Sequence, residues 1–141
     1  MEEYKTIQKS EHLRDTFTDK KILIVEDDDI GYSLLKEIFF DFDFVIERAI
    51  DGSEAIHFFE ETKDAFDLVL MDIRLPNING FEATSVIKDI NPSVPVIAVT
   101  AYVHSQSIYD SQNCGCDDFI SKPFEINHLI SVVQKNLTVN K

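Results

Sequence analysis

Short apolar runs alternate with helix-like stretches along most of this sequence, and this alternation limits the folds that the chain can adopt. The runs lie at residues 21–25, 45–49, 68–71, 96–99 and 119–121. The runs at 21–25 and 96–99 are rich in β-branched residues, which is typical of strands buried on both faces, and strands that alternate with helices are typical of a parallel sheet. We therefore predict an α/β fold, (βα)5, in which helices cover both faces of a doubly wound, five-stranded parallel sheet.

The stretches between the runs place apolar residues at helical spacing. In the first stretch we expect one stripe to face the sheet. This stripe contains Ile30, Leu34, Leu35, Ile38 and Phe39. Further helices are predicted from about residue 53, between Gly80 and Pro92, at about residues 105–112 and from about residue 127. The stretch at 105–112 has few apolar residues, which predicts a lightly anchored helix.

Chemically distinctive side chains stand where four of the predicted strands end. Glu26 and Asp27 follow the first strand, Asp72 the third, Thr100 the fourth and Lys122 the fifth. In an open parallel sheet, ligands bind outside the carboxyl ends of the strands, so we expect these residues to lie close together.

The residue types at these strand ends predict a phosphoryl-transfer pocket. Two carboxylates about 4 Å apart repel each other by about 4 kcal/mol at an effective dielectric constant of about 20, so a cation is expected between Asp27 and Asp72. Mg²⁺ prefers one or two carboxylates together with water and phosphate oxygens. Asp72 can then act as a nucleophile toward phosphorus, while Lys122 and Thr100 stabilise the transferring group.

These motifs resemble the receiver domain of two-component response regulators, a family that includes the chemotaxis response regulator. The resemblance covers residues 21–137 and depends on four segments, EDDD at 26–29, LVLMDIRLP at 68–76, VTA at 99–101 and SKPF at 121–124. It implies a flavodoxin-like strand order of 2-1-3-4-5. It also implies that Asp72 accepts a phosphoryl group from a phosphohistidine.

The resemblance further implies a role for each pocket residue. Asp27, Asp72 and the backbone carbonyl of Arg74 would bind Mg²⁺, and Glu26 would act mainly through a water molecule. Lys122 would precede a cis proline.

That proline is Pro123. Thr100 and Phe119 would be the switch hydroxyl and the switch aromatic residue. Ala101 and Tyr102 follow the switch threonine, and Tyr102, like Arg74, stands where family members control access of the hydrolytic water.

The resemblance implies a signalling domain whose only catalysis is its own phosphorylation and dephosphorylation, and not an enzyme. A histidine kinase or histidine phosphotransfer domain would donate the phosphoryl group. A downstream protein would bind the surface formed by residues of about 102–113 and 119–135. We expect a monomer or weak dimer, as a single-domain regulator or as the receiver of a hybrid histidine kinase.

Two alternative functions fit the sequence less well. An aspartate-nucleophile phosphatase needs an acid two residues after its nucleophile, where this chain has Arg74. An FMN-binding, flavodoxin-like protein needs hydroxyls and glycines in its phosphate loop, where this chain has the acids of residues 26–29.

Composition excludes several other partners and sites. The net charge of −13 argues against nucleic acid as a partner, and no apolar stretch is long enough to span a membrane. We expect a cytoplasmic domain at residues 20–138, preceded by a tail or linker at residues 1–19. Cys114 and Cys116 lack the second ligand pair of a structural zinc site, so we expect a role in a loop or in the core.

Overall fold

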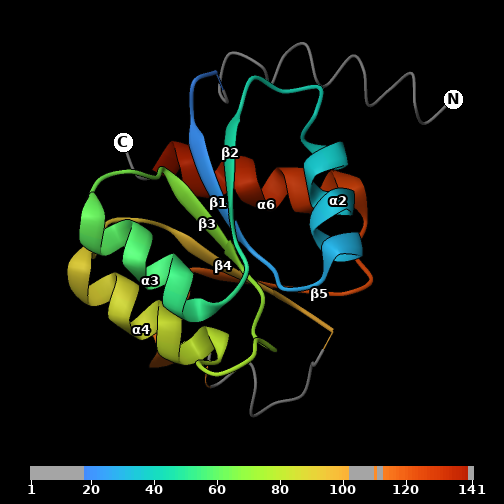
Figure 1. Cartoon of the computed structure of the whole chain (residues 1–141). Helices are drawn as coiled ribbons and strands as arrows, with labels where there is room; N and C mark the ends of the chain where they lie inside the picture. The colour runs from blue at the N-terminus through green and yellow to red at the C-terminus, as the bar shows by residue number, and fades with distance from the viewer. Residues whose placement is uncertain (1–17, 102–109, 111–112, 140–141) are drawn as a thin grey trace, which may run out of the picture.

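The computed structural model describes residues 18–101, 110 and 113–139, which form one sheet with helices on both faces (Figure 1). The strands are β1 (Lys21–Val25), β2 (Val45–Ala49), β3 (Leu68–Met71), β4 (Val96–Thr100) and β5 (Asp118–Ser121). The helices are α2 (Asp29–Ile38), α3 (Gly52–Glu61), α4 (Gly80–Ile90) and α6 (Ile126–Val139). All five predicted strands are present, and none differs from its predicted range by more than one residue at either end.

The sheet is parallel throughout and has the order β2-β1-β3-β4-β5. The predicted fold class and strand order are therefore confirmed. The helix expected at residues 105–112 lies outside the described residues except for Asp110, and the tail expected at residues 1–19 does so except for its last two residues. None of the helices in the described part of the chain is long and apolar enough to cross a membrane.

Two separate cores lie on opposite faces of the sheet. Helices α2 and α6 cover one face, and α3 and α4 cover the other (Figure 1). Leu35 of α2 and Phe39, the C-cap of this helix, belong to the first core together with Leu129 and Val133 of α6. Strands β1, β3 and β4 contribute side chains to both cores, so these three strands are covered on both faces.

The predicted apolar stripe of α2 was wrong at two of its five positions. Leu35 and Phe39 are buried and Ile38 packs against the core, but Ile30 is 80% exposed and Leu34 is 51% exposed. At 3.6 residues per turn, Ile30 lies about 140° around the helix from Leu35, so both cannot point at the sheet. The apolar residues of this helix therefore occupy two faces, of which one packs on the sheet.

Side-chain caps fix where three of the helices begin. Asp28 accepts a hydrogen bond from Gly31 N at 3.0 Å and caps α2. Asp51 caps α3 in the same way, and Asn79 forms a capping box with Glu82 at the start of α4. These caps satisfy backbone N–H groups at the helix starts and hold the loops that follow the strands.

Candidate functional site

The first turn of the site follows β1 and contains Glu26 and Asp27. Glu26 N donates to Ala49 O at 3.0 Å, so the residue is held beside the end of β2. The Glu26 side chain is buried and Asp27 is exposed. Asp28, the third acid of this turn, caps α2 instead. The turn therefore presents one buried and one solvent-exposed carboxylate.

Asp72 follows β3, the central strand, and lies directly beside this turn. Its backbone N donates to Val25 O at 3.0 Å, which joins the ends of β1 and β3. One carboxylate oxygen, Oδ1, accepts from Arg74 N at 3.1 Å. The Asp72 side chain is thus fixed at the carboxyl end of the sheet.

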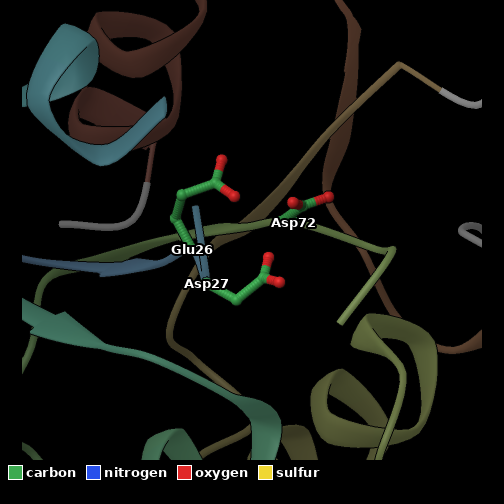
Figure 2. Close-up of side chains that lie close together, drawn as sticks. All are labelled: Glu26, Asp27 and Asp72. Atoms are coloured by element: carbon green, nitrogen blue, oxygen red, sulfur yellow. The ribbon is translucent and has the colours of Figure 1, made fainter. Parts of the chain in front are cut away.

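Three carboxylates converge in this space (Figure 2). One ligand oxygen from each of Glu26, Asp27 and Asp72 lies within 4.8 Å of the others. In the described part of the chain, this is the one group of acids, histidines and cysteines with an arrangement that could hold a metal ion. The predicted acid cluster is therefore formed.

Burial and a neighbouring acid raise the pKa of Asp72. Desolvation has the largest effect, followed by the hydrogen bond with Glu26 and the charge of Glu26, and the pKa rises from 3.8 to about 7. The charge of Lys122 and the hydrogen bond from Arg74 N oppose this rise. Ionising the whole cluster is unfavourable in the absence of additional positive charge, which is the electrostatic situation that a divalent cation relieves.

Lys122 reaches the cluster from the end of β5. Its Nζ forms an ion pair with Glu26 Oε1 at 2.8 Å, and its backbone N donates to Thr100 O at 2.8 Å. The peptide bond between Lys122 and Pro123 is cis, as the resemblance implied. Lys122 therefore links the last strand to the first turn of the site.

The two expected switch residues lie on neighbouring strands. Thr100 ends β4 and is fully buried, while Phe119 of β5 is half-buried and packs against the core under α3 and α4. Ala101 is exposed, as is Arg74. Tyr102 lies outside the described residues. The switch and access roles of these residues stay predictions.

Two residues that position the site were not identified from the sequence. Arg48 of β2 donates from Nε to Glu26 O at 3.1 Å, pairs with Asp29 at 2.8 Å, and lies over the ring of Tyr32. It therefore fixes the turn after β1. No local pattern identifies it, because its partners belong to other elements.

Gly80 at the start of α4 has a similar positioning role. A Cβ atom at this residue would lie 2.3 Å from Asp72 O and 2.7 Å from Ile73 Cα. Gly80 N also donates to Ile73 O at 3.0 Å. Only glycine allows this close approach of α4 to the segment that contains Asp72. Gly80 is the only glycine in the segment from Asp72 to the first residue of α4, and this is the signal that could have indicated its role.

Comparisons with known proteins agree with the fold and the acid cluster. The family model of the response regulator receiver domain matches residues 22–134. Transcription factor SKN7 of Candida albicans is 34% identical over 116 residues, which cover 82% of this chain and 20% of that protein. The chain thus spans a fifth of the length of this curated relative.

Two solved structures have the same fold. The CheY-like response regulator receiver domain protein from Methanospirillum hungatei JF-1 matches with a TM-score of 0.81 and 29% identity, over 87% of this chain and 97% of that chain. The receiver domain of sensor histidine kinase PA1611 from Pseudomonas aeruginosa PAO1 matches with a TM-score of 0.78 and 27% identity, over 86% of this chain and 99% of that chain. The latter structure has a magnesium ion coordinated in its active-site cleft. None of these matches supports the phosphatase or flavodoxin alternatives. The chain belongs to the response regulator receiver domain family and is a receiver domain of two-component systems.

Proposed function

We propose that this receiver domain is switched by phosphorylation of Asp72, with a phosphohistidine of a histidine kinase or phosphotransfer domain as the donor. The observation that supports this most strongly is the convergence of Glu26, Asp27 and Asp72, with Lys122 bound to the same cluster. Asp72 is central because it directly follows the middle strand, β3, and its side chain is partly buried.

The acid cluster fits Mg²⁺. A hard cation takes oxygen ligands, and Asp27, Asp72 and the backbone carbonyl of Arg74 would provide them, with Glu26 acting through water. The pKa of Asp72 is raised first by burial and then by the hydrogen bond and charge of Glu26, and a bound cation would offset both effects. The bound ion would neutralise charge on the phosphoryl oxygens. A magnesium ion in the active-site cleft of the PA1611 receiver supports this assignment by similarity.

The residues of this chain would divide the transfer reaction between them. A carboxylate oxygen of Asp72 attacks phosphorus, the phosphorus–nitrogen bond of the donor breaks, and its electron pair leaves with the imidazole. The hydrogen bond from Arg74 N to Oδ1 orients the attacking group. Lys122 exchanges its ion pair with Glu26 for the phosphoryl oxygens, and the Thr100 hydroxyl donates to them. Apart from this self-modification and its reversal by water, the domain catalyses no reaction.

The signal would leave the site through β4 and β5. Lys122 N is bonded to Thr100 O, so movement of either strand end affects the other. Phe119, whose half-buried ring packs on the neighbouring core, can then change its exposure. Its lack of a hydroxyl favours an inward population even before phosphorylation, because no buried O–H needs a partner. The proposed readout is binding of a downstream protein to the surface of about residues 102–113 and 119–135, by a monomer or weak dimer in the cytoplasm.

Intact-mass measurement after incubation with acetyl phosphate and Mg²⁺ tests the acceptor. We expect one added phosphoryl group on the wild-type protein and none on Asp72→Asn, because the substituted amide is a poor nucleophile. Asp89→Asn, which removes an exposed acid of α4, is the matched control and should be labelled normally. Equal labelling of the wild type and Asp72→Asn would place the acceptor at another residue.

Amide chemical shifts test the route from the site to the surface. Beryllofluoride, a phosphoryl mimic, should change the shifts of Asp27 and Asp72 and also those of residues 102–113 and Phe119. Changes confined to the neighbours of Asp72 would refute the proposed route while leaving the acceptor assignment intact.

A further inference from the structure

Two cysteine sulfurs meet in the turn that leads into β5. The Sγ atoms of Cys114 and Cys116 are 3.5 Å apart, and both side chains are partly buried. The distance permits a thiol–thiolate hydrogen bond and is short enough for one sulfur to attack a disulfide formed on the other. This pair lies outside the acid cluster, and the phosphorylation scheme does not use it.

The backbone around the pair holds the two sulfurs on one side of the turn. Cys114 N donates to Asp110 O at 3.0 Å, which fixes the backbone position of Cys114. Gly115 then has a φ of +100°, a conformation that side chains with a Cβ atom rarely adopt. In this backbone conformation of the intervening Gly115, the two sulfurs lie 3.5 Å apart.

Contacts to α4 and β4 anchor the second cysteine. Cys116 packs against the core under α3 and α4, with its Sγ 3.9 Å from Thr84 Oγ1. The next residue, Asp117, accepts from Lys88 Nζ at 2.7 Å and from Val96 N at 2.8 Å. Cys116 is therefore held by the fold.

The two thiols differ in chemical character. The hydrogen bond with Cys116 lowers the pKa of Cys114 to about 7, although burial and Asp110 act in the opposite direction. The pKa of Cys116 is raised, first by the same hydrogen bond and then by burial. A thiolate is the nucleophile in disulfide exchange, so Cys114 is suited to attack and Cys116 to resolve.

We propose that Cys114 and Cys116 form a redox-active dithiol that is oxidised to an intramolecular disulfide by low-molecular-weight disulfides. The Cys114 thiolate attacks one sulfur of the reagent R–S–S–R, the reagent S–S bond breaks, and one R–S⁻ leaves and is protonated by water. Cys116 loses its proton to solvent and attacks the Cys114 sulfur of the mixed disulfide, which expels the second R–S⁻. The protein loses two electrons and two protons, and the reagent gains them as two thiols.

The charge of the chain indicates the kind of reagent. The net charge is −13, and Asp110 and Asp117 flank the cysteine pair. A neutral disulfide meets less repulsion than an anionic one. Bis(2-hydroxyethyl) disulfide is therefore the probe for the test.

Intact-mass spectrometry of the acid-quenched reaction tests the proposal. The wild-type protein should lose the mass of two hydrogen atoms without accumulating an adduct. Cys116→Ser should stop at one mixed disulfide, because the resolving sulfur is missing, and Cys114→Ser should react several-fold more slowly. Wild-type protein with stable adducts on both cysteines, or with intermolecular disulfides on a non-reducing gel, would overturn the proposal.

Two controls test whether the dithiol reaction depends on the fold and whether it depends on the acid cluster. In denaturant, mixed disulfides should replace most of the intramolecular product, because the anchored turn is lost; an unchanged product ratio would contradict the proposed preorganisation. The cysteine pair of Asp72→Asn should react as that of the wild type does, because the pair lies outside the acid cluster. Loss of the reaction in this variant would contradict an independent site.

Discussion

Replacing Asp72 by asparagine should stabilise the protein, and the gain should depend on pH. The pKa of Asp72 is raised from 3.8 to about 7, so this carboxyl holds its proton more tightly in the folded protein than in the unfolded chain. The contribution of the Asp72 carboxyl to the free energy of unfolding therefore falls as the pH rises from about 4 to about 7, and it stays low above that range. An asparagine has no such titration.

The size of the effect follows from the shift and from the exposure of the group. One pKa unit corresponds to about 1.4 kcal/mol, so a shift to about 7 corresponds to about 4 kcal/mol for a fully buried carboxyl. Because Asp72 is only partly buried, solvent screening reduces this figure to about 2 kcal/mol. We expect the free energy of unfolding of Asp72→Asn to exceed that of the wild type by about this amount at pH 8 and by less than about 1 kcal/mol at pH 5.

Urea unfolding of both proteins in EDTA, at several pH values between these limits, measures the difference directly. Asp89→Asn removes the same charge from an exposed position of α4 and should show no comparable pH-dependent gain. If the free energies of unfolding of Asp72→Asn and the wild type differ by the same amount at pH 5 and pH 8, the raised pKa is wrong. Equal stability of the two proteins at pH 8 would refute the reasoning altogether.

Three further predictions concern the same site. Mg²⁺ should raise the thermal unfolding midpoint of the wild type, because a ligand of the folded state stabilises it, and Asp27→Ala should abolish this response in differential scanning calorimetry. Lys122→Met should lower the free energy of unfolding in urea by about 1–3 kcal/mol, because Glu26 loses its ammonium partner while it is buried; unchanged stability would mean that this ion pair contributes little. Gly80→Ala should lower the free energy of unfolding in urea by about 1–3 kcal/mol, because the new Cβ atom would meet the backbone of Asp72. The variant should also be labelled more slowly by acetyl phosphate. Normal labelling together with normal stability would contradict the close approach.

The sheet could be predicted well from the sequence because its strands differ so clearly from their surroundings. Strands β3 and β4 are buried along their whole length and are apolar except for Thr100 at the end of β4, so composition marks their limits to within one residue. The acids that follow β1 and β3 meet because parallel strands end at one edge. For the same reason the cluster of Glu26, Asp27 and Asp72 was predictable without a structure.

Features that depend on helix rotation or on side-chain contacts between elements could not be predicted in this way. The spacing of Ile30, Leu34 and Leu35 is helical, but it does not say which of the two apolar faces of the helix packs on the sheet. The contact of Arg48 with Glu26 joins elements that are distant in sequence. The approach of the Cys114 and Cys116 sulfurs depends on the backbone conformation of Gly115, which residue identity alone does not determine.

The ion pair between Lys122 and Glu26 has a thermodynamic consequence for a site that would bind two ligands. Lys122 has one ammonium group, and a phosphoryl group at Asp72 would compete with Glu26 for it. When the ammonium group moves to the phosphoryl group, the buried Glu26 carboxylate loses its partner, and another cation nearby would stabilise it. Phosphorylation should then tighten the binding of the metal ion, and by linkage the metal ion should favour the phosphorylated state by the same factor. A single shared lysine is therefore enough to make the two binding equilibria cooperative.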